Sequence, residues 1–169
     1  MTGRNKNKTK TIILHPNKGV SIANSNVFFK LGSNIRRYQP MKYDLSHSDK
    51  SDSFNTSFYE LFDYPIEIWT NNEKKAGTIE TIRCEKTCVW NGIELIGMLY
   101  DDFITQFHLI HDCYDKVYSY GPKRNGREYE VYDFYNYGLS IWVWRKRIRD
   151  ILVSDYTEAI KEDEMNGNK

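Results

Sequence analysis

Cysteine and histidine residues give this sequence its best metal-ligand candidates. Cys84 and Cys88 are four positions apart, and His108, His111 and Cys113 follow further along the chain. Thiolates and imidazoles are typical zinc ligands, but this spacing is not that of a zinc finger or ribbon. Buried thiols beside exposed histidines are the simpler interpretation, so we predict no cofactor and no metal. A zinc-binding protein remains an alternative hypothesis.

Acid–base or nucleophilic chemistry has weaker support. Asp101 and Asp102 form an adjacent acidic pair, but neighbouring positions of a helix point apart. Acidic residues in a first helical turn are favoured by the helix dipole, which explains the pair without catalysis. The sequence contains no phosphate-binding glycine loop, no nucleophile elbow and no His-Glu-x-x-His motif. We therefore predict that the protein is not an enzyme.

Aromatic residues are the most unusual feature of the composition. Thirteen Tyr, eight Phe and four Trp make up 15% of the 169 residues, and the formal net charge is only +1. A charge so close to zero does not predict binding to nucleic acid or to an anionic membrane. No apolar run approaches the roughly 20 residues of a membrane span, and none resembles a secretory signal. We expect a cytoplasmic protein that is a monomer when free.

The order of predicted elements occurs twice along the chain. In the second half, apolar spacing predicts a helix over 99–107, and alternation predicts strands at 116–120, 129–134, 139–144 and 148–153. In the first half, a short helix within 24–32 and strands at 41–45, 59–64, 66–69 and 79–82 follow the same order. The predicted fold class is α+β: two tandem repeats, each of short helices packed on an antiparallel four-stranded meander. The predicted units are a disordered basic arm (1–10), a first repeat (11–84), a second repeat (85–156) and a flexible tail (157–169).

Aliphatic and aromatic side chains alternate along the predicted strands. In 139–144 the aliphatic residues share one face, while Trp142 and Trp144 share the other with Ser140. With helices on the aliphatic face, the aromatic face stays open, and a contiguous apolar surface of this kind indicates a binding site. An alternative is that these aromatics pack a second core. The predicted partner-binding residues are Glu60, Phe62, Glu67, Trp69, Glu130, Tyr132, Phe134, Trp142 and Trp144.

The repeated strand pattern, Tyr-x-hydrophobic-aromatic followed by hydrophobic-x-Ile-Trp and Ile-x-x-Ile, resembles a known superfamily. It is that of the β-lactamase inhibitor protein and the small lipoprotein of outer-membrane assembly. The segments 15–20 and 90–98, the latter before Tyr100-Asp-Asp-Phe103, are similar to bacterial immunity proteins with this repeat. The likeness covers roughly 11–156, but the first helix lacks a Glu-rich face and the insertion 46–57 has no counterpart.

The resemblance implies an immunity protein that neutralises a cognate protein toxin with its open sheet face. Glu60, Glu67 and Glu130 would then pair with basic residues of a toxin of the nuclease type. A structural or scaffold module of envelope assembly is the alternative function that the same superfamily suggests.

Overall fold

The protein is mostly β, and the predicted α+β class is wrong. The computed structural model describes residues 10–38, 56–61, 64–71, 77–119, 126–157 and 160–161, together with the backbone of 43–47. Among these residues, the helices described over their full length are α1 (Tyr100–Phe107) and two short 3-10 helices, η1 (Ile35–Tyr38) and η2 (Tyr135–Tyr137), and Thr157, Ile160 and Lys161 are also helical. No described helix has the length and apolar character needed to cross a membrane.

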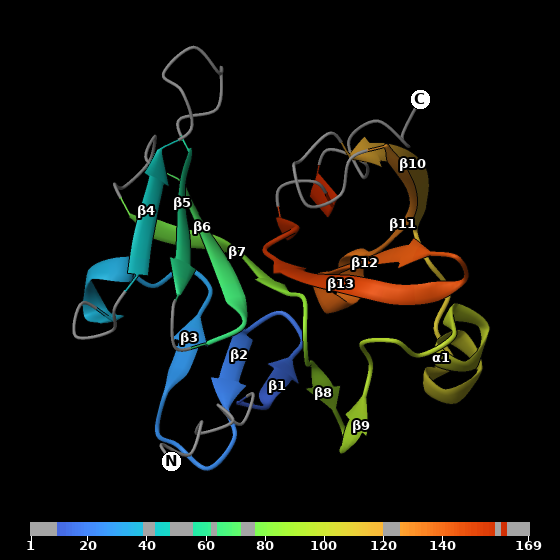
Figure 1. Ribbon diagram of the computed structural model, residues 1–169, viewed down its shortest axis with the longest axis horizontal. Coiled ribbons are helices and arrows are strands. Elements are labelled where there is room, and N and C mark those ends of the chain that lie inside the picture. Colours follow the sequence, from blue (N-terminus) through green and yellow to red (C-terminus); the bar gives the residue numbers. More distant parts are fainter. Residues whose placement is uncertain are drawn as a thin grey trace, which may run out of the picture.

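Eight strands form the larger of two sheets, in the order β10-β11-β12-β13-β7-β6-β5-β4 (Figure 1). All neighbours in it are antiparallel. It therefore consists of two four-stranded meanders that join where β13 pairs with β7. The strands are β4 (Tyr43–His47), β5 (Thr56–Leu61), β6 (Ile66–Asn71), β7 (Thr78–Cys84), β10 (Cys113–Ser119), β11 (Arg127–Phe134), β12 (Leu139–Trp144) and β13 (Arg147–Ser154).

A small sheet takes strands from both halves of the chain, in the order β3-β2-β1-β8-β9. Its members are β1 (Ile12–His15), β2 (Gly19–Ile22), β3 (Phe28–Lys30), β8 (Val89–Trp90) and β9 (Ile93–Glu94). β1 and β8 pair in parallel, which brings the two halves together. A single hydrophobic cluster then runs from the small sheet into both meanders. The predicted boundary between 84 and 85 thus falls at the end of β7 and inside a shared core.

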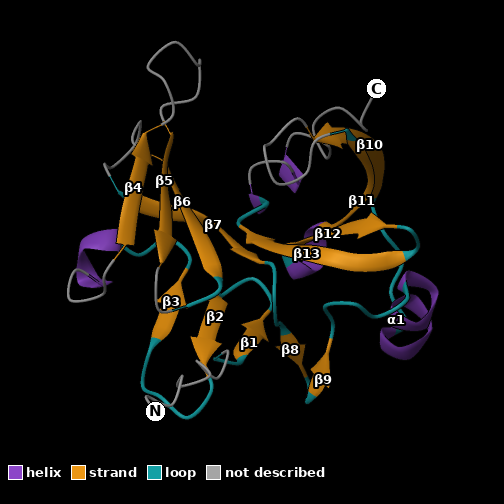
Figure 2. Ribbon diagram, viewed as in Figure 1, coloured by secondary structure: helices purple, strands orange, loops and turns teal. Residues whose placement is uncertain are grey.

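The large sheet curves strongly, with the small sheet and α1 on its outer side (Figure 2). Each meander has one register shift, between Trp69 and Thr70 on β6 and between Trp142 and Val143 on β12. These shifts make Glu80 and Arg149 the extra residues of β7 and β13. A bulge increases the local twist and bends the strand, which accounts for the curvature. We call the side away from the small sheet the concave face.

The loop that enters each meander docks in the same way. Gly32 N–H donates to the Ile79 carbonyl and Gly97 N–H to the Ile148 carbonyl, both at 2.8 Å. Both glycines have positive φ, 74° and 88°, a conformation that disfavours residues with a Cβ. In return, the backbone N–H groups of Ile79 and Ile148 each donate to a carbonyl of the loop that enters the same meander, at 2.9 Å. The same backbone contact therefore positions the bulged strand of each meander.

Local structure differs between the halves where helices were expected. The helix predicted over 99–107 is confirmed as α1, which ends at His108 in the left-handed conformation. The helix predicted within 24–32 is wrong, because this segment makes a turn at Asn24 (φ 58°) and then forms β3. Pairing with β2 buries Phe29 completely. Burial of an aromatic on a sheet outweighs the weak helical preference of Asn- and Ser-rich segments.

Candidate functional site: the concave sheet face

Two tryptophans occupy matching positions on the concave face. Trp69 of β6 and Trp142 of β12 lie at the two bulges, and each is half-buried and outside the main hydrophobic cluster. Phe58 meets Trp69 edge-on at 5.2 Å between ring centroids, and Tyr129 lies 5.7 Å from Trp142. The Nε1 atoms of both indoles are buried without a hydrogen-bond partner. The ring surface that remains exposed is therefore carbon, which suits apolar contact.

A partly buried ion-pair network lies between the two tryptophans. Arg83 of β7 reaches Glu67 at 3.1 Å, and Glu85 and Asp150 at 3.4 Å each. Asp150 is 1% exposed and stands opposite Trp142 in the register. Burial raises the pKa of Asp150 to about 6, although the Arg83 guanidinium opposes this shift. The centre of the concave face is thus polar and fixed, with the apolar rings on either side.

The two ends of the concave face carry opposite charge. Glu60 is exposed on β5, directly opposite Glu67 of β6. At the other end, the guanidinium carbons of Arg127, Arg145 and Arg149 lie 4.4, 4.3 and 5.4 Å from the ring centroid of Trp144. One end is therefore acidic, and the other combines an aromatic ring with arginines.

The predicted site residues separate into two groups. Glu60, Glu67, Trp69, Trp142 and Trp144 share the concave face, as the cross-strand register shows. Phe62 lies outside the described residues.

Glu130, Tyr132 and Phe134 do not lie beside Trp142 and Trp144, because they point to the opposite, convex side of β11. Tyr132 stands opposite Ile141, whereas Val131 stands opposite Trp142. The reason is packing on α1: Phe103 contacts Phe134, with 5.9 Å between ring centroids. Phe134 is completely buried and belongs to the core.

Sequence reasoning missed an aromatic cluster on the convex side. Tyr100 of α1 stacks on Tyr132 with ring centroids 3.9 Å apart, and Tyr114 and His111 each lie 5.1 Å from Tyr132. Burial, followed by the charge of Glu130, raises the pKa of Tyr132. Tyr114 is 45% exposed, so the cluster reaches the surface at the β10 edge. Only the tertiary contact between α1 and β11 brings these residues together.

Part of the concave face is a small core of its own. Tyr129, Val131 and Leu152 are buried there but do not join the main cluster. Tyr156, beyond the end of β13, also lies on this side, where its hydroxyl donates to Asp133 at 3.3 Å. A second core therefore forms on this side from residues outside the predicted set, whereas Trp69, Trp142 and Trp144 keep exposed surface.

The Cys and His residues considered for zinc are all described. Cys84 and Cys88 are buried, and their thiols are close enough to interact, which together with burial raises the pKa of Cys88. His108 and His111 are exposed. Among the described residues, no three His, Cys, Asp or Glu side chains are arranged to hold a metal ion.

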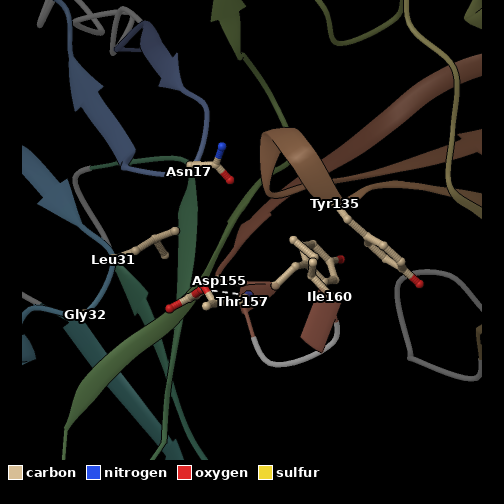
Figure 3. A pocket seen from close by; sticks show the side chains of 8 residues that line it. Asn17, Leu31, Gly32, Tyr135, Asp155, Thr157 and Ile160 are labelled. Carbon is tan, nitrogen blue, oxygen red and sulfur yellow. Dashed lines mark hydrogen bonds between the residues drawn. The ribbon is translucent and has the colours of Figure 1, made fainter. Parts of the chain in front are cut away.

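A pocket of about 250 Å³ lies at the junction of the two halves (Figure 3). Asp155 accepts a hydrogen bond from Thr157 N at 3.0 Å and so begins the C-terminal turn on one side of the pocket. Leu31 and Ile160 contribute apolar surface. The lining residues are Asn17, Leu31, Gly32, Tyr135, Asp155, Tyr156, Thr157 and Ile160.

Comparison with known proteins finds no family model, no curated protein and no solved structure that matches this chain.

Proposed function

We propose that this chain is an immunity protein that binds and neutralises a cognate bacterial protein toxin through its concave face. The observation that carries the proposal is the matched pair Trp69 and Trp142. Both rings lie where a bulge bends the sheet, and both leave carbon surface exposed on the concave side. Tryptophan is the residue type most enriched among binding hot spots, since it buries a large area at little entropic cost.

The surroundings of the rings favour a protein partner over a small ligand. The two tryptophans flank a rigid ion-pair network centred on Arg83, so the surface is preorganised and loses little freedom on binding. Glu60 offers an exposed carboxylate to basic groups of a toxin, beside Glu67, which pairs with Arg83, and charge complementarity of this kind speeds association. In this proposal the protein acts as a monomer in the cytoplasm, where it covers the toxin's active site.

Co-expression with the product of the adjacent gene in the source genome tests the function. Protection of growth by the wild-type chain is expected, together with a complex that co-purifies. Replacing Trp69 and Trp142 with Ala removes two hot-spot side chains, each of which contributes about 2 kcal/mol or more, so affinity should fall by roughly a thousandfold. Ile110→Ala is the matched control, because Ile110 is apolar, 88% exposed and follows α1 on the convex side.

Two results would count against the proposal. Unchanged affinity of the double variant, with wild-type thermal stability, would remove the tryptophans from the interface. Loss of affinity in the Ile110→Ala control would place the interface on the convex side instead.

A further inference from the structure

Three arginines from separate positions in the sequence surround Trp144. Arg127 begins β11, Arg145 lies in the turn between β12 and β13, and Arg149 is the bulge residue of β13. Their guanidinium carbons all lie within 5.4 Å of the centroid of the indole ring. Stacking on the ring orients a guanidinium and leaves the N–H groups at its edge free to donate.

Among the described residues, no carboxylate forms an ion pair with these guanidinium groups, although burial raises the pKa of Asp150 and the charge of Arg149 opposes this rise. In the part of the chain that the structure describes, the ion pairs use Arg83 and Lys116, and none uses an arginine of the Trp144 cluster. The Nε of Arg149 is moreover buried without a hydrogen-bond partner. Three like charges held around one ring repel one another, and an anion placed between them would relieve this repulsion.

The turn between β12 and β13 contains residue types that disfavour its backbone conformation. Arg145 and Lys146 have φ of 51° and 64°, as in a type I′ turn, where Asn-Gly is the favoured pair. Side chains with a Cβ are disfavoured in this left-handed region. Two long basic residues at these positions indicate that charge at the tip contributes to function at the expense of turn stability.

The anion that fits this site is a carboxylate of a protein segment. Nucleobases bind by stacking on free aromatic faces, whereas guanidinium groups already occupy the Trp144 ring. A phosphate backbone that continued along the concave face would meet the carboxylates of Glu67 and Glu60. A short acidic segment avoids both obstacles, and arginine donors match carboxylates in forked geometry.

We infer that the arginines around Trp144 form a binding site for an acidic segment of a protein partner, at the opposite end of the concave face from Glu60. The inference rests on the proposed function only in taking the partner to be a protein. Such a partner would meet the face with a basic region near Glu60 and an acidic one near Trp144, so binding in the reverse orientation is disfavoured.

Binding of a fluorescein-labelled oligoglutamate peptide to the full chain, measured by anisotropy, tests this site. The double variant Arg127→Gln/Arg145→Gln is expected to bind roughly three- to tenfold more weakly for each arginine removed. The matched control, Arg36→Gln/Arg37→Gln, removes the same charge from two exposed arginines of η1 and should bind as the wild type does. Raising the salt concentration should weaken wild-type binding.

A second variant separates binding from folding. Arg145→Gly suits the positive φ of the turn, so it should raise the melting temperature while weakening oligoglutamate binding. Equal loss in the η1 control, or no loss in either cluster variant, would overturn the site. Stronger binding of an oligothymidylate of equal charge, or of phosphatidylserine vesicles, would overturn the choice of a protein segment.

These outcomes are distinct from those of the proposed function. Protection against a toxin without oligoglutamate binding would leave the immunity function standing and remove the acidic-segment site. Oligoglutamate binding through the Trp144 cluster without any toxin protection would leave the acidic-segment site standing and remove the immunity function.

Discussion

Replacing Phe134 with Ala should destabilise the fold strongly and leave the concave face intact. Phe134 is completely buried, and its ring packs on Phe103 of α1 at 5.9 Å between centroids. Truncation of a buried Phe costs about 3–5 kcal/mol. An unfolding entropy of about 2.1 cal/mol/K per residue gives about 0.35 kcal/mol/K for this chain, so the melting temperature should fall by about 10 °C.

Thermal and urea unfolding, followed by circular dichroism, measure this loss. Phe134→Leu should cost less than about 1.5 kcal/mol, because it keeps most of the volume. Ile110→Ala, at an 88% exposed position, should stay within about 0.5 kcal/mol of the wild type. If Phe134→Ala lowered the free energy of unfolding by less than about 1 kcal/mol, the packing argument would be refuted, since truncation of a solvent-facing ring costs little stability. It would mean that β11 presents Phe134 on the concave side.

Three further predictions concern a buried acid, a glycine and a thiol. Because the pKa of Asp150 is raised from 3.8 to about 6, the folded state binds the extra proton, and the free energy of unfolding should fall as the pH rises from about 4 to 6. Asp150→Asn should lack this decline of about 3 kcal/mol, as urea midpoints across that pH range would reveal. Gly138→Ala should melt well below Gly92→Ala: both have positive φ, but only at Gly138 does a new Cβ come within 2.6 Å of the Ser154 carbonyl oxygen. If the two melted alike, the close approach would be disproved. Cys113, which is partly exposed, should be the one thiol that reacts rapidly with a thiol reagent before unfolding, and a count of two or three fast thiols would contradict the burial of the others.

The positions of the large-sheet strands were largely predictable because alternation is a local property, whereas the five short strands of the small sheet were not predicted. In β6 and β12 the aliphatic residues occupy every second position. The strand predicted at 139–144 forms with these bounds, and the one predicted at 66–69 extends to 71. The helix over 99–107 was equally visible from its apolar spacing. The same alternation correctly placed Trp69 and Trp142 on the face away from the helix.

The alternation of β11 could not be interpreted in this way. Tyr129 and Val131 on one side are as apolar as Tyr132 and Phe134 on the other, so hydrophobicity does not decide which side faces the core. Packing against α1 decides which side of β11 faces the core, because Phe103 and Tyr100 contact aromatic side chains on the convex side. The helix prediction within 24–32 was wrong for a similar reason, since the strand that forms there depends on pairing with β2.

By itself the sequence determined roughly where the strands of the large sheet run, where α1 lies and which side of β6 and β12 carries the tryptophans, since each follows from periods of two or about four residues. Only the tertiary structure decided the joining of two meanders through β7 and β13, the orientation of β11 and the gathering of arginines around Trp144. These features arise from contacts between residues far apart in sequence. Register, bulges and packing on α1 set such contacts, and no local pattern encodes them.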